Sequence, residues 1–166
     1  KFREFCRNGG EPLGGIIGGK SVPGTMNATF QTCDPGSSQW LARVYEMGAA
    51  EVDAAVKAAQ RAFAGNGVNG WRDFPVEERI ELVKKLVELC DRDRDVLLAC
   101  EILDGGKVSE LAEGDVDQIR ACAEYFCGVA RRIPLGDGPG MDVADGVRGF
   151  TYREPWGVVA GIIPWN

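Results

Sequence analysis

The last ten residues of this chain, GVVAGIIPWN, constrain its fold more than any other stretch. Residues 158–163 carry no polar side chain, and Pro164 and Trp165 then end the run. Such a run is typical of a strand covered on both faces, as in a parallel sheet. Parallel neighbours need crossover connections of about a dozen residues or more, and nothing follows Asn166. We therefore expect an α/β protein of which this chain holds an incomplete fold.

Composition excludes several classes of partner. The chain has 166 residues, of which 45% are hydrophobic, enough to bury the core of one ordinary domain. Its formal charge of −6 would repel a phosphate backbone, so we expect no nucleic acid. No run approaches the roughly 18 apolar residues of a membrane span, and the first four residues, KFRE, have no apolar signal core. We expect a cytoplasmic protein without a membrane partner.

The cysteines do not indicate a metal site. Six cysteines occur without any Cys-x-x-Cys, and the chain has no histidine to complete a zinc site. Cys90 and Cys122 lie on the apolar faces of predicted helices, where we expect them to pack as small hydrophobic residues.

Short strands are predicted in the first 45 residues. Gly18 and Gly19 separate two short segments, 16–17 and 20–22, and suit a tight hairpin turn with positive φ angles. Residues 29–33 and 41–45 predict two more strands, joined by a loop that begins at Asp34. Together they predict a small antiparallel layer.

Helical periodicity then dominates the sequence. We expect helices over 52–63, from Pro75 to Cys90, over 96–103 and from Ala112 to near Gly128. A loop should follow over residues 134–140. The repeating apolar residues are Val52, Ala55, Val56, Ala59 and Phe63; Ile80, Val83, Val87 and Cys90; and Ala112, Val116, Ile119, Ala123 and Phe126.

Charged residues support two of these helices. Glu51 and Asp53 lie where negative charge favours the N-terminal end of the helix dipole. Glu81 with Lys85, and Glu88 with Arg92, have the i,i+4 spacing that predicts stabilising ion pairs.

Residues 65–70, GNGVNG, match the G-x-G-x-x-G dinucleotide pattern. That pattern needs a strand before it and a helix N-terminus after it to face the pyrophosphate. Here a predicted helix precedes it and Trp71 follows, so we interpret it as a loop between helices.

Two motifs carry a family resemblance. Residues 153–159, REPWGVV, lead into IPWN at 163–166, and residues 101–107 read EILDGGK. With the weaker segments 34–35 and 52–63, they resemble, in order, the N-terminal part of an NAD(P)-dependent aldehyde dehydrogenase. The resemblance runs from about Ile16 to Asn166 and corresponds to roughly the first third of a complete enzyme.

This resemblance implies a fold and its division. It implies part of a Rossmann-type NAD(P)-binding domain, with small antiparallel strands, then a helical cluster, then the first parallel strand. Residues 1–138 would form the strand and helical part, residues 139–155 an oligomerisation hairpin, and residues 156–166 the first nucleotide-binding strand and the start of the active-site loop.

The resemblance also implies a reaction and site residues. In the family a cysteine thiolate attacks the aldehyde, hydride passes to NAD or NADP, and a glutamate-activated water hydrolyses the thioester. That cysteine and glutamate lie beyond the equivalent of Asn166, whose amide resembles the oxyanion donor. Ile162, Ile163, Pro164 and Trp165 resemble the stretch that lines the cofactor, mainly through backbone. Asp104 resembles a residue near a monovalent-cation site.

Alternatives stay open for function and for single residues. The chain alone would be inactive; with the remaining sequence it would oxidise an aldehyde to a carboxylic acid as a homodimer or homotetramer. A non-catalytic, acidic helical interaction module is the alternative function. Asn166 has a second interpretation as an ordinary loop residue, Asp104 as a helix C-terminal residue, and Lys107 as a donor to the last helix carbonyls.

Overall fold

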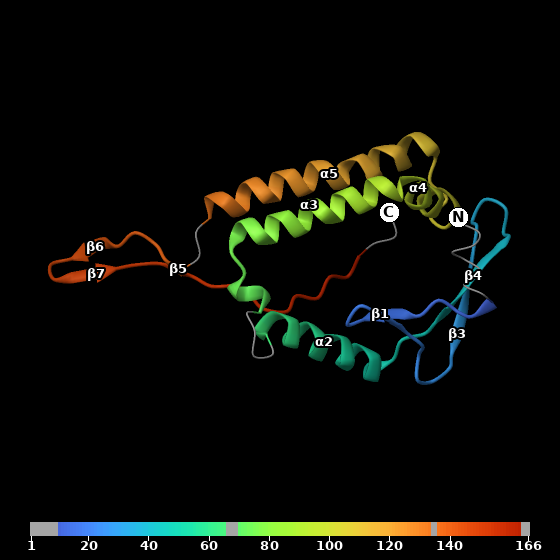
Figure 1. The fold of residues 1–166 in the computed structure, drawn as a ribbon, viewed down its shortest axis with the longest axis horizontal. Helices are drawn as coiled ribbons and strands as arrows, with labels where there is room; N and C mark the ends of the chain where they lie inside the picture. The colour runs from blue at the N-terminus through green and yellow to red at the C-terminus, as the bar shows by residue number, and fades with distance from the viewer. Residues whose placement is uncertain (1–9, 66–69, 134–135, 164–166) are drawn as a thin grey trace.

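The computed structural model describes residues 10–65, 70–133 and 136–163 of the chain, with strands at both ends and helices in the middle (Figure 1). Every described strand belongs to an antiparallel pair. The mixture of helices and small strand pairs is consistent with a partial α/β domain. The elements are β1 (Gly15–Ile17), β2 (Lys20–Val22), β3 (Thr29–Cys33), β4 (Trp40–Tyr45), α2 (Ala49–Ala64), η2 (Trp71–Asp73), α3 (Val76–Arg92), α4 (Arg94–Leu103), α5 (Ser109–Arg132), β5 (Gly136–Asp137), β6 (Met141–Ala144), β7 (Val147–Gly149) and β8 (Tyr152–Arg153).

The two predicted N-terminal hairpins are present. Gly18 and Gly19 have φ angles of 59° and 78°, which glycine adopts without the steric cost of a Cβ atom, and they turn β1 into β2. β3 pairs with β4 from Thr29 opposite Tyr45, with an irregularity before Cys33. Both antiparallel pairs are therefore confirmed, but they form two separate two-stranded sheets and not one layer.

The helical core lies mainly between α3 and α5, which run side by side in Figure 1. Ile80 and Val87, seven residues apart on α3, are buried, as are Ala112, Val116 and Cys127 on α5. Helix α4 packs against α5 near one end of this pair. The predicted helical stripes of α3 and α5 therefore do form a core.

Two expectations for the helices are wrong in detail. Helix α5 does not end near Gly128 but continues to Arg132, because a single glycine lowers helix stability without ending a helix that is packed along its length. The apolar residues Val52 and Val56 of α2 are exposed. Helix α2 contacts η2 and β1.

The predicted ion pairs on α3 form with different partners. Lys84 Nζ lies 2.7 Å from Glu81 Oε1, and Lys85 Nζ lies 2.8 Å from Glu88 Oε2, both at i,i+3 spacing. Arg92 pairs with Asp93. Positions i+3 and i+4 are both neighbours on a helix surface, and these exposed side chains exchange partners at little cost.

The expectation for Cys122 is also wrong. Its side chain is exposed, whereas Cys90 is half-buried and Cys127 is buried. Each residue turns a helix by roughly 100°, so Cys122 points away from the side on which Ala123 and Cys127 line a groove with α3.

In the part of the chain that the structure describes, no helix is long and apolar enough to cross a membrane.

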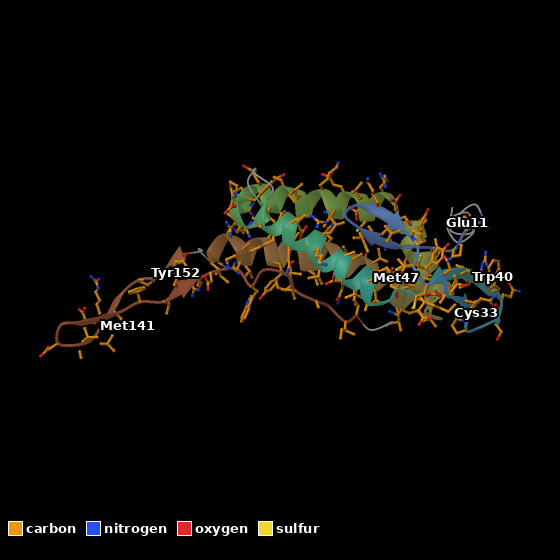
Figure 2. The ribbon with its side chains drawn as sticks, turned by 90° about the horizontal axis from the view of Figure 1, so that it is seen from below. Glu11, Cys33, Trp40, Met47, Met141 and Tyr152 are labelled. Carbon is orange, nitrogen blue, oxygen red and sulfur yellow. The ribbon has the colours of Figure 1, made fainter. Side chains whose placement is uncertain are left out.

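Residues 136–153 form an arm that extends away from the helices, where Met141 and Tyr152 lie in Figure 2. β5 pairs with β8, and further out β6 pairs with β7. Strand β8, at the base of the arm, covers only Tyr152–Arg153. The arm matches the position of the hairpin expected over residues 139–155.

The strand expected at residues 158–163 is absent from the structure. This segment has no regular secondary structure, and Ile162 is 100% exposed. A strand is held by backbone hydrogen bonds to a neighbour, and no described strand pairs with this segment. The prediction of a first parallel strand is therefore wrong for the described residues.

Candidate functional site

The structure describes only part of the predicted cofactor and oxyanion site. Ile162 and Ile163 lie in the irregular segment, 100% and 87% exposed. Pro164, Trp165 and Asn166 lie outside the described residues. The roles predicted for these five residues stay predictions.

The segment that leads toward this site, residues 154–163, lies beside the C-terminal end of α2. A Cβ atom on Gly157 would lie 4.0 Å from Cε1 of Phe63. Gly157 has a φ of 85°, a conformation that side chains other than glycine rarely adopt. The segment 154–163 thus leaves the arm and passes α2 through a turn that requires glycine at position 157.

Asp104 lies at the C-terminal end of α4. Its backbone N–H donates to the carbonyl of Cys100 at 2.9 Å, and its φ and ψ of −90° and −40° are helical. This is the helix-end position that the sequence offered as the alternative to a cation ligand. No group of three or more His, Cys, Asp or Glu that would hold a metal ion occurs within residues 10–65, 70–133 and 136–163. The monovalent-cation assignment stays a prediction.

Lys107 joins the ends of α4 and α5. Its Nζ atom donates to Asp115 and lies 3.2 Å from Glu101, and the side chain is only 16% exposed. Hydrogen bonds to Asp115 and then to Glu101 raise the pKa of the ammonium group. The sequence predicted that this amine would reach helix carbonyls; instead it binds two carboxylates, and its backbone N–H donates to the Glu101 carbonyl at 3.3 Å.

The turn between β3 and β4 meets the C-terminal end of α4, although the two segments lie far apart in the sequence. The Asp34 carboxylate accepts hydrogen bonds from the N–H of Gly36 at 2.8 Å and from the hydroxyl of Ser37 at 2.6 Å, which shapes the β3–β4 turn. A Cβ atom on Gly106 would lie 2.6 Å from Cγ of Pro35. Gly106 has a φ of 69°. The segments 34–39 and 101–107 are therefore packed together through a position that only glycine fits.

Sequence reasoning missed the role of Glu51. This carboxylate is 6% exposed and accepts hydrogen bonds from the N–H groups of Thr25 at 3.0 Å and Gly48 at 2.8 Å. Hydrogen bonds from the side chain and backbone of Thr25, then from Gly48, lower its pKa to about 2. The spacing from Gly48 to Glu51 is that of a capping box, a signal that would have predicted the local half of this arrangement.

A groove of about 410 Å³ lies between α3 and α5. Val83, Val87, Ala123 and Cys127 form its apolar part, and Arg120 and Arg131 are among its charged lining residues. Arg131 Nη2 lies 2.8 Å from Glu77 Oε2, and Arg120 is paired with Asp91. These two guanidinium groups are therefore already neutralised within the helical pair.

The described titratable groups with shifted pKa values are all held by local contacts. They are paired with opposite charges or accept hydrogen bonds at turns and helix ends, as Lys107 and Asp34 do. Such contacts explain the shifts as parts of the fold.

Comparison with known proteins assigns this arrangement to a family. The model of the aldehyde dehydrogenase family matches residues 22–166. An aldehyde dehydrogenase of Aspergillus niger is 36% identical over 156 residues, which cover 94% of this chain and 30% of that protein. The NAD(P)+ aldehyde dehydrogenase 1 of Saccharomyces cerevisiae is 32% identical over 157 residues, again with 94% and 30% covered.

A solved structure agrees with these relatives. The NAD+ complex of an aldehyde dehydrogenase from Bacillus cereus has a TM-score of 0.71 and 31% identity, covering 89% of this chain and 28% of that one. The chain thus spans about 30% of the length of the curated relatives it matches. The resemblance found in the sequence is confirmed, and the chain belongs to the aldehyde dehydrogenase family.

Proposed function

We propose that this chain is the N-terminal part of an NAD(P)-dependent enzyme that oxidises an aldehyde to a carboxylic acid. One observation carries the proposal: the family match extends from residue 22 through the final Pro164, Trp165 and Asn166. The contact between Pro35 and Gly106 supports it, since it joins two segments that the sequence identified as family motifs.

Asn166 is proposed as a catalytic residue of that enzyme. Its side-chain amide would donate a hydrogen bond to the oxygen that becomes negative when a thiol adds to the aldehyde. A donor placed before the reaction stabilises this charge more in the transition state than in the substrate complex. The nucleophile and the general base would come from sequence beyond position 166.

NAD or NADP is proposed as the cofactor, with Ile162, Ile163, Pro164 and Trp165 contributing to its site. Support comes from the relatives, of which one is named for NAD(P)+ and another is an NAD+ complex. The described residues do not form the site, because no described strand pairs with residues 158–163.

We further propose that the arm of residues 136–153 serves subunit contact in a homodimer or homotetramer. Its support is the exposure of large apolar side chains on a two-stranded element, which by itself is at most marginally stable in water. The division into residues 1–138, 139–155 and 156–166 belongs to the same proposal. The exposed side chains are Met141, Val143, Val147, Phe150 and Tyr152.

Two finer assignments complete the proposal. The protein would act in the cytoplasm, where a reducing environment suits the free thiols of Cys33, Cys90, Cys122 and Cys127. Asp104 would lie near a monovalent cation in the assembled enzyme, where its exposed position after α4 leaves its carboxylate accessible.

The test is aldehyde-dependent reduction of NAD+ or NADP+ by the product of the complete reading frame. We expect turnover from that product and none from the purified chain of 166 residues. A reading frame that stops after Asn166, or a longer product that binds no cofactor, would favour the non-catalytic interaction module instead.

An exchange of segments tests the same proposal without the natural downstream sequence. Residues 22–166 replace the matching segment of the Bacillus cereus enzyme, and assembly, NAD+ binding and turnover are compared with the parent enzyme. We expect all three to be retained at reduced levels. An exchanged protein that assembles and binds NAD+ yet has no turnover would contradict the equivalence of the two segments.

A further inference from the structure

We draw no further inference here: the strongest candidate, the exposed apolar surface of α3 and α5 around Leu82, Leu86 and Phe126 with the small cavity where the Nε atom of Arg79 is buried, carries no proposal because nothing in the described residues shows what covers it.

Discussion

The carboxylate of Glu51, in the first turn of α2, accepts a hydrogen bond from the backbone N–H of Thr25, 26 residues earlier in the chain. Its other oxygen accepts from the N–H of Gly48 at 2.8 Å. One buried side chain thereby fixes both the start of α2 and the loop that follows β2. The helix and the N-terminal strands are joined through this charge.

Replacing this carboxylate should weaken the contact between the start of α2 and the loop that follows β2. Glu51→Ala leaves the N–H groups of Thr25 and Gly48 without their acceptor, and unsatisfied buried donors destabilise a fold. We expect a lower midpoint in urea unfolding than for the unchanged chain. Glu113→Ala, at an exposed position on α5, serves as the control and should leave the midpoint nearly unchanged. Equal midpoints for the two variants would show that the Glu51 contacts do not stabilise the fold.

The same group predicts a pH dependence. Its pKa is lowered from 4.5 to about 2, so its stabilising effect is fully present above pH 4.5 and is lost as the pH falls toward 2. The unfolded chain takes up the proton first on acidification. We expect the stability difference between the unchanged chain and Glu51→Gln to shrink over this range in unfolding experiments. A difference that stays constant from pH 7 to pH 3 would contradict the assignment.

Gly106→Ala should destabilise the contact between the β3–β4 turn and the end of α4. Alanine at a φ of 69° costs about 1–2 kcal/mol, and its Cβ would also displace Pro35. The measurement is the free energy of unfolding. We expect a loss larger than the backbone cost alone.

Two matched glycine variants separate these causes. Gly146→Ala meets a similar φ of 72° with no atom within 4 Å of the new Cβ, so it reports the backbone cost alone. Gly114→Ala lies within α5 with open space around it and should stabilise the helix by about 0.5–1 kcal/mol. A Gly106→Ala effect no larger than that of Gly146→Ala would mean that Pro35 yields without cost.

Local patterns in the sequence were sufficient to predict most elements of this fold. The glycine pair 18–19 and the helical spacing of Ile80 and Val87 correspond to observed structure. These features depend on neighbours close in the chain. Residues 158–163 were predicted as a strand from their apolar character, yet a strand depends on distant partners, and none is present in the described residues.

The candidate site was less accessible to sequence reasoning, for two physical reasons. The contacts of Lys107 with Glu101 and Asp115 depend on the angle between α4 and α5, which periodicity does not determine. The hydrogen bond from Thr25 to Glu51 joins residues 26 positions apart, with β3 and β4 between them, so only its local part, the Gly48–Glu51 spacing, was visible in the sequence. The roles of Ile162, Ile163 and Asn166 came from family resemblance and stay predictions.

Lys107→Met should lower the melting temperature of the chain. The substitution keeps much of the apolar stem but leaves the carboxylates of Glu101 and Asp115 near each other without the cation between them. Lys57→Met is the matched control, since Lys57 pairs with Asp53 on an exposed helix surface. We expect a clear decrease for Lys107→Met and little change for Lys57→Met. The opposite order would contradict the bridging role.

The purified chain should associate through its exposed apolar side chains. Leu86 is 58% exposed on α3, and Ile162 and Ile163 are almost fully exposed. We expect binding of a hydrophobic dye and concentration-dependent association in sizing experiments, both reduced by Leu86→Lys. Gln118→Lys adds the same charge at an exposed polar position on α5 and should have little effect. A single monomer peak at high concentration, without dye binding, would contradict this expectation.

Steady-state kinetics of Asn166→Ala in the complete enzyme test whether Asn166 belongs to the catalytic site of an aldehyde dehydrogenase. Loss of one oxyanion donor costs on the order of 3 kcal/mol, or about a hundredfold in kcat. Asn166→Asp should be at least as impaired, because it places a negative acceptor beside the developing charge. Titration with NAD+ should show cofactor binding retained in both variants. We expect a large loss of kcat with little change in cofactor affinity, whereas a normal kcat for Asn166→Ala would show that its amide is not an oxyanion donor.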